Sequence, residues 1–166
     1  MLKSIFDYTY NKIRLIEERL HNGATLLVKI NRSIQVDSFS CAVQAVYSIL
    51  NYYNINRSHD EIASKLGTTE EDGTDTEPIL NYLRSLKLKV IINEKATIDT
   101  IKESINKLSP VLITIDDWEH WVLIYGYSEN RLFLLDSNKK RILNSIPHTE
   151  FLQRWDDNWI ATIYKA

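Results

Sequence analysis

Apolar side chains in the first half of the chain recur at helical spacing. In residues 2–21 they are separated mainly by three, four or seven positions and line one face of a predicted helix: Leu2, Ile5, Phe6, Ile13, Ile16 and Leu20. The same periodicity predicts a helix over about 40–53, with an apolar stripe formed by Ala42, Ala45, Val46, Ile49 and Tyr53. Capping signals at Ser58 and Thr97, and the tolerated Pro78, predict three more helices, over about 58–66, 77–86 and 97–108.

Runs rich in β-branched and aromatic residues dominate the second half. They predict strands over 111–115, 121–127 and 131–135, with a short hairpin turn at 128–130. Weaker signals predict strands at 25–30, 88–92, 141–143 and 159–164, and a helical turn at 149–155. Helices that precede antiparallel strands are typical of an α+β fold, so we expect N-terminal helices packed on a C-terminal antiparallel β-meander. No domain boundary is evident, and we expect a single domain over 1–166 in which 1–23 form an additional N-terminal helix.

Composition narrows the function classes. The chain is 44% apolar and 25% charged, as in ordinary soluble globular proteins, and its net charge of −2 gives no broad attraction to nucleic acid or acidic membranes. No run approaches the roughly 20 apolar residues of a membrane span. One cysteine cannot form an internal disulfide, and zinc-type spacing is absent, so we expect no metal or cofactor. The charged N-terminus lacks the apolar core of a secretion signal, and we expect a reducing, cytoplasmic location.

The single cysteine, Cys41, lies in the first turn of the helix predicted over 40–53. Unpaired N–H groups and the helix dipole favour a thiolate at this position. Gln35 lies in the polar loop six residues upstream, His120 begins a predicted strand, and Asp136 follows the next one. In chain order these residues supply an oxyanion donor, a nucleophile, a base and a group that orients the base.

The predicted hairpin tests this arrangement geometrically. If its turn centres on Glu129, His120 lies opposite position 138, and Asp136 is its diagonal neighbour on the same face, within side-chain reach. A slip of one residue would place the two on opposite faces. Asn138 is the rival of Asp136 for the orienting role.

These motifs resemble those of the papain-like cysteine peptidases. The Gln-x5-Cys spacing of QVDSFSC, a following helix, and a late His-aromatic-Val strand with an Asp carry the resemblance. Within that group, CAVQAVYSILNYYNI, LGTTEEDGTDTEPILNYLRSLKL and HWVLIYGYSENRLFLLDS are most similar to the bacteriocin-processing family, known from bacteriocin exporters that cut after a double glycine in a leader peptide. The likeness spans roughly 35–137 and implies four roles: nucleophile for Cys41, base for His120, orienter for Asp136 and oxyanion donor for Gln35.

The chain departs from that family at two positions. Ser40-Cys41-Ala42 stands where the family commonly has Asp-Cys-Gly, and Ser137 stands where proline is frequent. The sequence predicts a cysteine peptidase that acts on a peptide or protein substrate. An acyltransferase or deamidase with the same triad remains an alternative, because the acceptor is chosen by pocket shape, and so does a non-catalytic peptide-binding domain.

Two surface features bear on partners. If the acidic residues within 70–77 and 116–119 rim the cleft, they favour a cationic substrate. The amphipathic helix 2–21 could pack on the domain, mediate a dimer or dock a partner.

Overall fold

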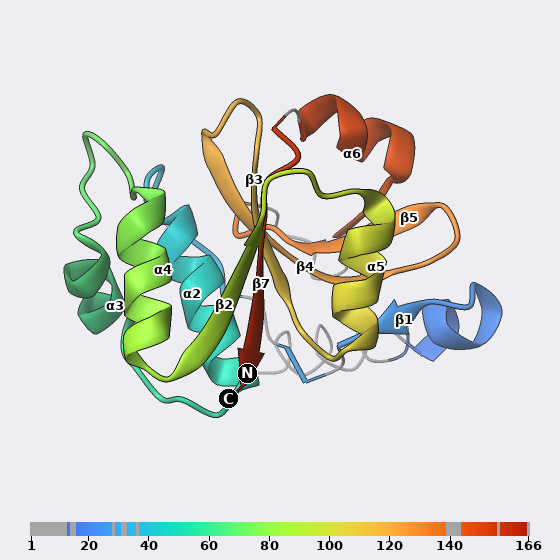
Figure 1. Cartoon of the computed structure of the whole chain (residues 1–166), viewed down its shortest axis with the longest axis horizontal. Helices are drawn as coiled ribbons and strands as arrows, with labels where there is room; N and C mark the ends of the chain where they lie inside the picture. The colour runs from blue at the N-terminus through green and yellow to red at the C-terminus, as the bar shows by residue number, and fades with distance from the viewer. Residues whose placement is uncertain are drawn as a thin grey trace.

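Helices lie on both sides of an antiparallel sheet (Figure 1). The computed structural model describes residues 13, 16–27, 29–30, 33–35, 37–138, 144–155 and 157–165. Within this part of the chain, α2, α3 and α4 gather on one side of the sheet and α5 lies on the other. The predicted α+β class is therefore confirmed.

The helices form where periodicity and capping residues predict them. Their bounds are α2 (Cys41–Tyr52), α3 (His59–Leu66), α4 (Thr76–Ser85), α5 (Ile98–Asn106) and α6 (His148–Arg154). The Ser58 hydroxyl accepts the Glu61 N–H at 3.1 Å, and Thr97 and Thr100 form a reciprocal capping box at the start of α5. These side chains satisfy N–H groups that a helix start leaves unpaired.

The sheet is not a simple meander. Its strands are β1 (Thr25–Leu26), β2 (Leu88–Asn93), β3 (Val111–Ile115), β4 (His120–Tyr127), β5 (Arg131–Leu135), β6 (Asn144–Pro147) and β7 (Ile160–Lys165). The order is β2-β7-β3-β4-β5-β6, with β1 paired to β4, so the last strand inserts between β2 and β3. The first four residues of β7 are buried, whereas β2 has several exposed positions. A strand covered on both faces belongs inside a sheet, which explains why β7 is internal and β2 takes the edge.

Two of the weaker strand predictions differ from the structure or lie outside its described residues. Of the strand expected over 25–30, the structure has only Thr25–Leu26. The one expected over 141–143 lies outside the described residues, and β6 begins just after it.

The β4–β5 hairpin has the predicted register where it matters for Asp136. Leu123 pairs with Leu135 and Ile124 with Leu134, as a turn centred on Glu129 requires. Nearer the turn, a β-bulge between Ile124 and Gly126 shifts the pairing by one position. The extra residue of the bulge lies near the turn, so the end of the hairpin that carries His120 and Asp136 keeps the predicted register.

The N-terminal segment keeps its apolar stripe in solvent. Residues 16–21 are helical, and the rest of the predicted helix 2–21, apart from Ile13, lies outside the described residues. Ile13, Ile16 and Leu20 are 51%, 55% and 74% exposed, so the described part of the stripe is not buried against the domain. Within the described ranges, no helix has the length and hydropathy needed to cross a membrane.

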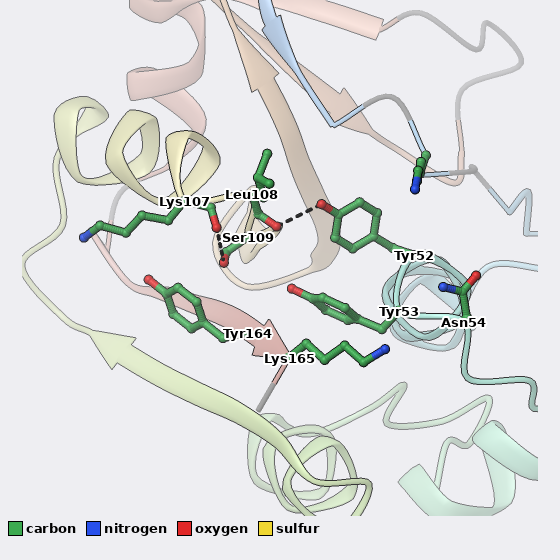
Figure 2. A pocket seen from close by; sticks show the side chains of 9 residues that line it. Tyr52, Tyr53, Asn54, Lys107, Leu108, Ser109, Tyr164 and Lys165 are labelled. Carbon is green, nitrogen blue, oxygen red and sulfur yellow. Dashed lines mark hydrogen bonds between the residues drawn. The ribbon is translucent and has the colours of Figure 1, made fainter.

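Two neighbouring tyrosines tie the end of α2 to the rest of the fold. Figure 2 shows them in a pocket of about 340 Å³ that also involves β7 and the turn after α5. The buried Tyr53 hydroxyl donates to the Ile163 carbonyl at 2.6 Å, and the more exposed Tyr52 hydroxyl donates to the Leu108 carbonyl at 2.9 Å. Burial raises the pKa of Tyr53 well above its usual value, so its hydroxyl stays a donor.

Removing these hydroxyls should have unequal effects on stability. We expect Tyr53→Phe to lower the free energy of unfolding by about 1–3 kcal/mol, because the Ile163 carbonyl loses a buried donor. Tyr52→Phe is the matched control and should cost roughly 0.5 kcal/mol, because water can replace an exposed donor. Urea unfolding measures both variants, and equal losses would contradict the distinction.

Candidate active site

Cys41 sits at the start of α2, in a turn that the preceding loop fixes. The Asp37 carboxylate accepts the N–H groups of Phe39 at 3.0 Å and Ser40 at 2.7 Å. The chain then enters the helix at Cys41, which is 7% exposed. The His120 side chain and the backbone N–H groups of Trp121 and Ala42 face its sulfur and lower the pKa of the thiol. Each of these contacts stabilises a negative charge on the sulfur.

His120 and Asp136 meet where β4 and β5 separate. The His120 Nε2 and the Asp136 Oδ1 are 2.8 Å apart, and the Asp136 side chain is only 2% exposed. The β4–β5 ladder reaches no further than Leu123 and Leu135, so the start of β4 has no partner strand on this side and lies open to Cys41. Because Nε2 faces the carboxylate, Nδ1 is the ring nitrogen left for the Cys41 sulfur.

The rival residue Asn138 supports Asp136. Its backbone N–H donates to Asp136 Oδ1 at 2.9 Å, the same oxygen that His120 contacts. The structure thus pairs His120 with Asp136, and Asn138 helps to orient the carboxylate.

The pKa values of the cysteine and histidine shift in opposite directions. Burial lowers the pKa of His120, but hydrogen bonds and charge attraction from Asp136 and Cys41 outweigh it and raise the pKa to about 9. Burial raises the pKa of the Cys41 thiol, but hydrogen bonding from His120 and the Trp121 N–H outweighs it and holds the pKa below its usual value. Both shifts act in the direction of a thiolate beside an imidazolium.

Gln35 is held between the loops that carry the other residues. Ser137 Oγ donates to Gln35 Oε1 at 2.6 Å, and the Gln35 N–H donates to the Ser137 carbonyl at 3.3 Å. Gln35 Nε2 donates to the Asp37 carbonyl at 2.8 Å, which occupies one of its two amide hydrogens. The described hydrogen bonds thus join Gln35 to Ser137, which follows Asp136, and to Asp37 in the loop before Cys41. None of them joins Gln35 to Cys41.

Three groups that support the site were not predicted from the sequence. The Ser137 hydroxyl positions the Gln35 amide, and its place directly after Asp136 is the feature of the sequence that points to it. Asp37 caps the turn before Cys41, and an aspartate ahead of a predicted helix start is a known signature of such turns. The N–H of Trp121 has no sequence signal, because any residue except proline supplies one.

In the described part of the chain, no group of three or more His, Cys, Asp or Glu residues is placed to hold a metal ion.

Known proteins share this fold. A sequence model of the peptidase C39 family matches residues 29–166. No functionally curated protein matches the chain.

Solved structures of peptidase domains superpose on most of the chain. A double glycine motif protease from an AMS/PCAT transporter, in complex with its leader peptide, is 17% identical with a TM-score of 0.68, covering 83% of this chain and 93% of that one. The peptidase domain of Streptococcus ComA is 17% identical with a TM-score of 0.69, covering 82% and 99%. A C39-like peptidase from Bacillus anthracis is 15% identical with a TM-score of 0.69, covering 86% and 98%. At these identities the likeness establishes a common papain-like fold.

Proposed function

The chain belongs to the peptidase C39 family and is a cysteine peptidase, and on that premise we propose that its active site consists of Cys41, His120, Asp136 and Gln35. The observation that carries the proposal is the bond between His120 Nε2 and Asp136 Oδ1 at 2.8 Å, with His120 near enough to Cys41 that each shifts the pKa of the other. A nucleophile, its base and a group that orients the base thereby lie next to one another in space, in that order.

The proposed reaction proceeds through a thioester. The Cys41 thiolate attacks the carbonyl carbon of the scissile peptide bond, and the carbonyl oxygen becomes an oxyanion. The His120 imidazolium gives its proton to the leaving amine as the C–N bond breaks. Neutral His120 then removes a proton from water, which attacks the thioester and releases the acid product and the thiolate. Asp136 holds the imidazole ring throughout and stabilises its charged form.

Gln35 is the proposed side-chain donor to the oxyanion, together with the Cys41 backbone N–H. Its support is the fixed position of the amide: Ser137 and Asp37 bind it, and one amide hydrogen remains after the bond to Asp37. A donor fixed before the reaction needs no reorganisation when charge develops.

Loss of this donor should slow the chemical step. We expect Gln35→Ala to reduce kcat by about 10²–10³ while KM changes little, because the oxyanion exists only after attack. Ser137→Ala is a matched comparison, since it removes the group that orients the amide but keeps the amide. It should cost less than Gln35→Ala in steady-state assays with a quenched fluorescent peptide. A larger loss in Ser137→Ala would contradict the assigned roles.

An acyltransferase or deamidase with the same triad is the second candidate. Mass analysis of the products separates it from a peptidase. We expect each cleaved peptide bond to gain one water, with or without a primary amine in the reaction. Transfer of the acyl group to that amine, or release of ammonia from a glutamine side chain, would overturn the peptidase assignment.

We propose that the substrate is a peptide or protein segment and that the protein works in the cytoplasm. The solved double glycine motif protease holds a leader peptide, which supports an extended peptide ligand on this fold. A reducing compartment keeps the single Cys41 as a thiol.

We further propose that residues 1–23 are an addition to the peptidase domain that contacts a partner or a second copy. The support is the exposure of Ile16 and Leu20, and the start of the family match at residue 29. Deleting 1–23 should therefore change Tm by less than about 4 °C, because little apolar surface is exposed by the loss. Calorimetry tests this, and a larger fall would show that the segment belongs to the folded core.

A further inference from the structure

A second pocket adjoins the one that contains Cys41. It has a volume of about 440 Å³ and lies between the loop before α2, α2 itself and α3. It shares Ser33 and Gln44 with the narrow pocket around Cys41. Its size lies within the range of about 300–1,000 Å³ that is usual for ligand sites. The residues beside Cys41 thus border a space large enough for a long side chain.

One part of the pocket wall is apolar. Ile34, Phe39, Val43 and Ala63 line it, with Val43 buried and Ile34 exposed at 53%. This surface can cover the methylene groups of a long side chain, which gain from leaving water even when the end of the chain is charged.

Three polar side chains of the pocket, Ser33, Gln44 and His59, bind one another. Ser33 Oγ donates to Gln44 Oε1 at 2.5 Å, so the His59 Nε2, 2.8 Å away, is the donor to that hydroxyl. The His59 ring also stacks on Tyr47 with 3.9 Å between ring centroids. These contacts make the Ser33 side a fixed wall, and the ligand must be recognised by other groups.

Those other groups are two carboxylates. Asp37 and Asp60 line the pocket, and its lining contains neither lysine nor arginine. The bonds from Phe39 and Ser40 both go to Oδ1 of Asp37. The nearby Arg57 pairs with Glu61 at 3.0 Å, and among the described residues no ion pair engages Asp60. Two carboxylates in a lining that has no lysine or arginine favour a positively charged ligand.

We propose that this pocket binds a lysine or arginine side chain of the peptide substrate, next to the bond that Cys41 attacks. The stem lies along the apolar wall, and the cationic end lies between Asp37 and Asp60. A glycine would leave the pocket empty. The inference rests on the proposed function, and it gives this chain a preference for a basic residue near the cleavage site.

Asp60 is the residue to change. It lies on α3, whereas Asp37 also fixes the turn before Cys41. Asp60→Asn removes one charge at constant shape, and Asp99→Asn on α5 is the charge-matched control across the sheet. The probes are internally quenched hexapeptides in which a single arginine or norleucine is moved through the positions around the cleaved bond.

The wild type should cleave one arginine peptide about tenfold faster in kcat/KM than its norleucine counterpart, which corresponds to one charge contact. Asp60→Asn should reduce that preference, because only Asp37 remains charged, and should slow the arginine peptide more than the norleucine peptide, while Asp99→Asn keeps the preference. Equal cleavage of arginine and norleucine peptides at every position would overturn the pocket assignment. So would an equal loss for both peptides in Asp60→Asn.

Measuring peptide binding without cleavage tests the pocket independently of the proposed catalytic residues. The same peptides can be titrated into Cys41→Ala by calorimetry, where no cleavage occurs. Tighter binding of an arginine peptide, weakened about tenfold by Asp60→Asn, supports the pocket even if no peptide is hydrolysed. Equal affinity for arginine and norleucine peptides overturns the pocket even if hydrolysis is fast.

Discussion

Replacing Cys41 with alanine should abolish peptide hydrolysis and leave the fold intact. The sulfur is the atom that forms the thioester, so its removal should lower kcat by at least about 10⁴-fold. Alanine fits the start of a helix, and the thiol is a small buried group, so the protein should still unfold cooperatively. Activity is measured with a quenched fluorescent peptide, and folding by circular dichroism and thermal unfolding.

Two further variants make this result specific. Cys41→Ser keeps the size and hydrogen bonds of the side chain but provides a much weaker nucleophile, so it should be nearly as inactive. A double variant, Cys41→Ala with His120→Ala, should lose no more than Cys41→Ala alone, because residues that act as a unit are not additive. Hydrolysis that survives in Cys41→Ala, after removal of wild-type traces by thiol alkylation, would refute the nucleophile.

The contact between His120 and Asp136 could be predicted because it depends on local geometry. A short hairpin relates its two strands through the turn, so the position of Glu129 fixes which residues share a face. The structure has this register at Leu123–Leu135 and places the carboxylate 2.8 Å from the ring. The bulge near Gly126 was not predicted, but it lies on the turn side and does not alter the site.

Features that join distant segments of the chain could not be predicted from the sequence. The placement of β7 between β2 and β3 depends on burial of both its faces, which a run of apolar residues cannot distinguish from other buried elements. The Gln35–Ser137 bond links positions 102 residues apart through two loops that have no periodicity. The pocket beside Cys41 likewise combines a loop with α2 and α3. Its carboxylates, Asp37 and Asp60, are not among the acidic residues that the sequence singled out as a possible rim.

Replacing His120 with alanine should remove both the general acid and the activation of the thiol. Without the hydrogen bond and charge of His120, only the Trp121 and Ala42 N–H groups still oppose the effect of burial, so the pKa of Cys41 rises and the thiolate fraction falls. We expect alkylation of Cys41 by iodoacetamide near pH 6 to slow by at least about tenfold, because each unit of pKa changes the thiolate fraction tenfold. The alkylation rate is followed by mass spectrometry, with hydrolysis measured in parallel and expected to fall at least about 10³-fold.

The pH profile distinguishes this role from a structural one. The pKa of His120 is raised to about 9, so wild-type hydrolysis should decline as the pH rises through about 9 and the imidazolium loses its proton. Asp136→Asn removes the charge that helps to hold this pKa up while it keeps a hydrogen-bond acceptor, so the decline should move to lower pH. A structural defect would lower the rate without moving the profile. Unchanged alkylation of Cys41 at pH 6 in His120→Ala would contradict the thiolate–imidazolium pair, because no other described side chain bonds the sulfur.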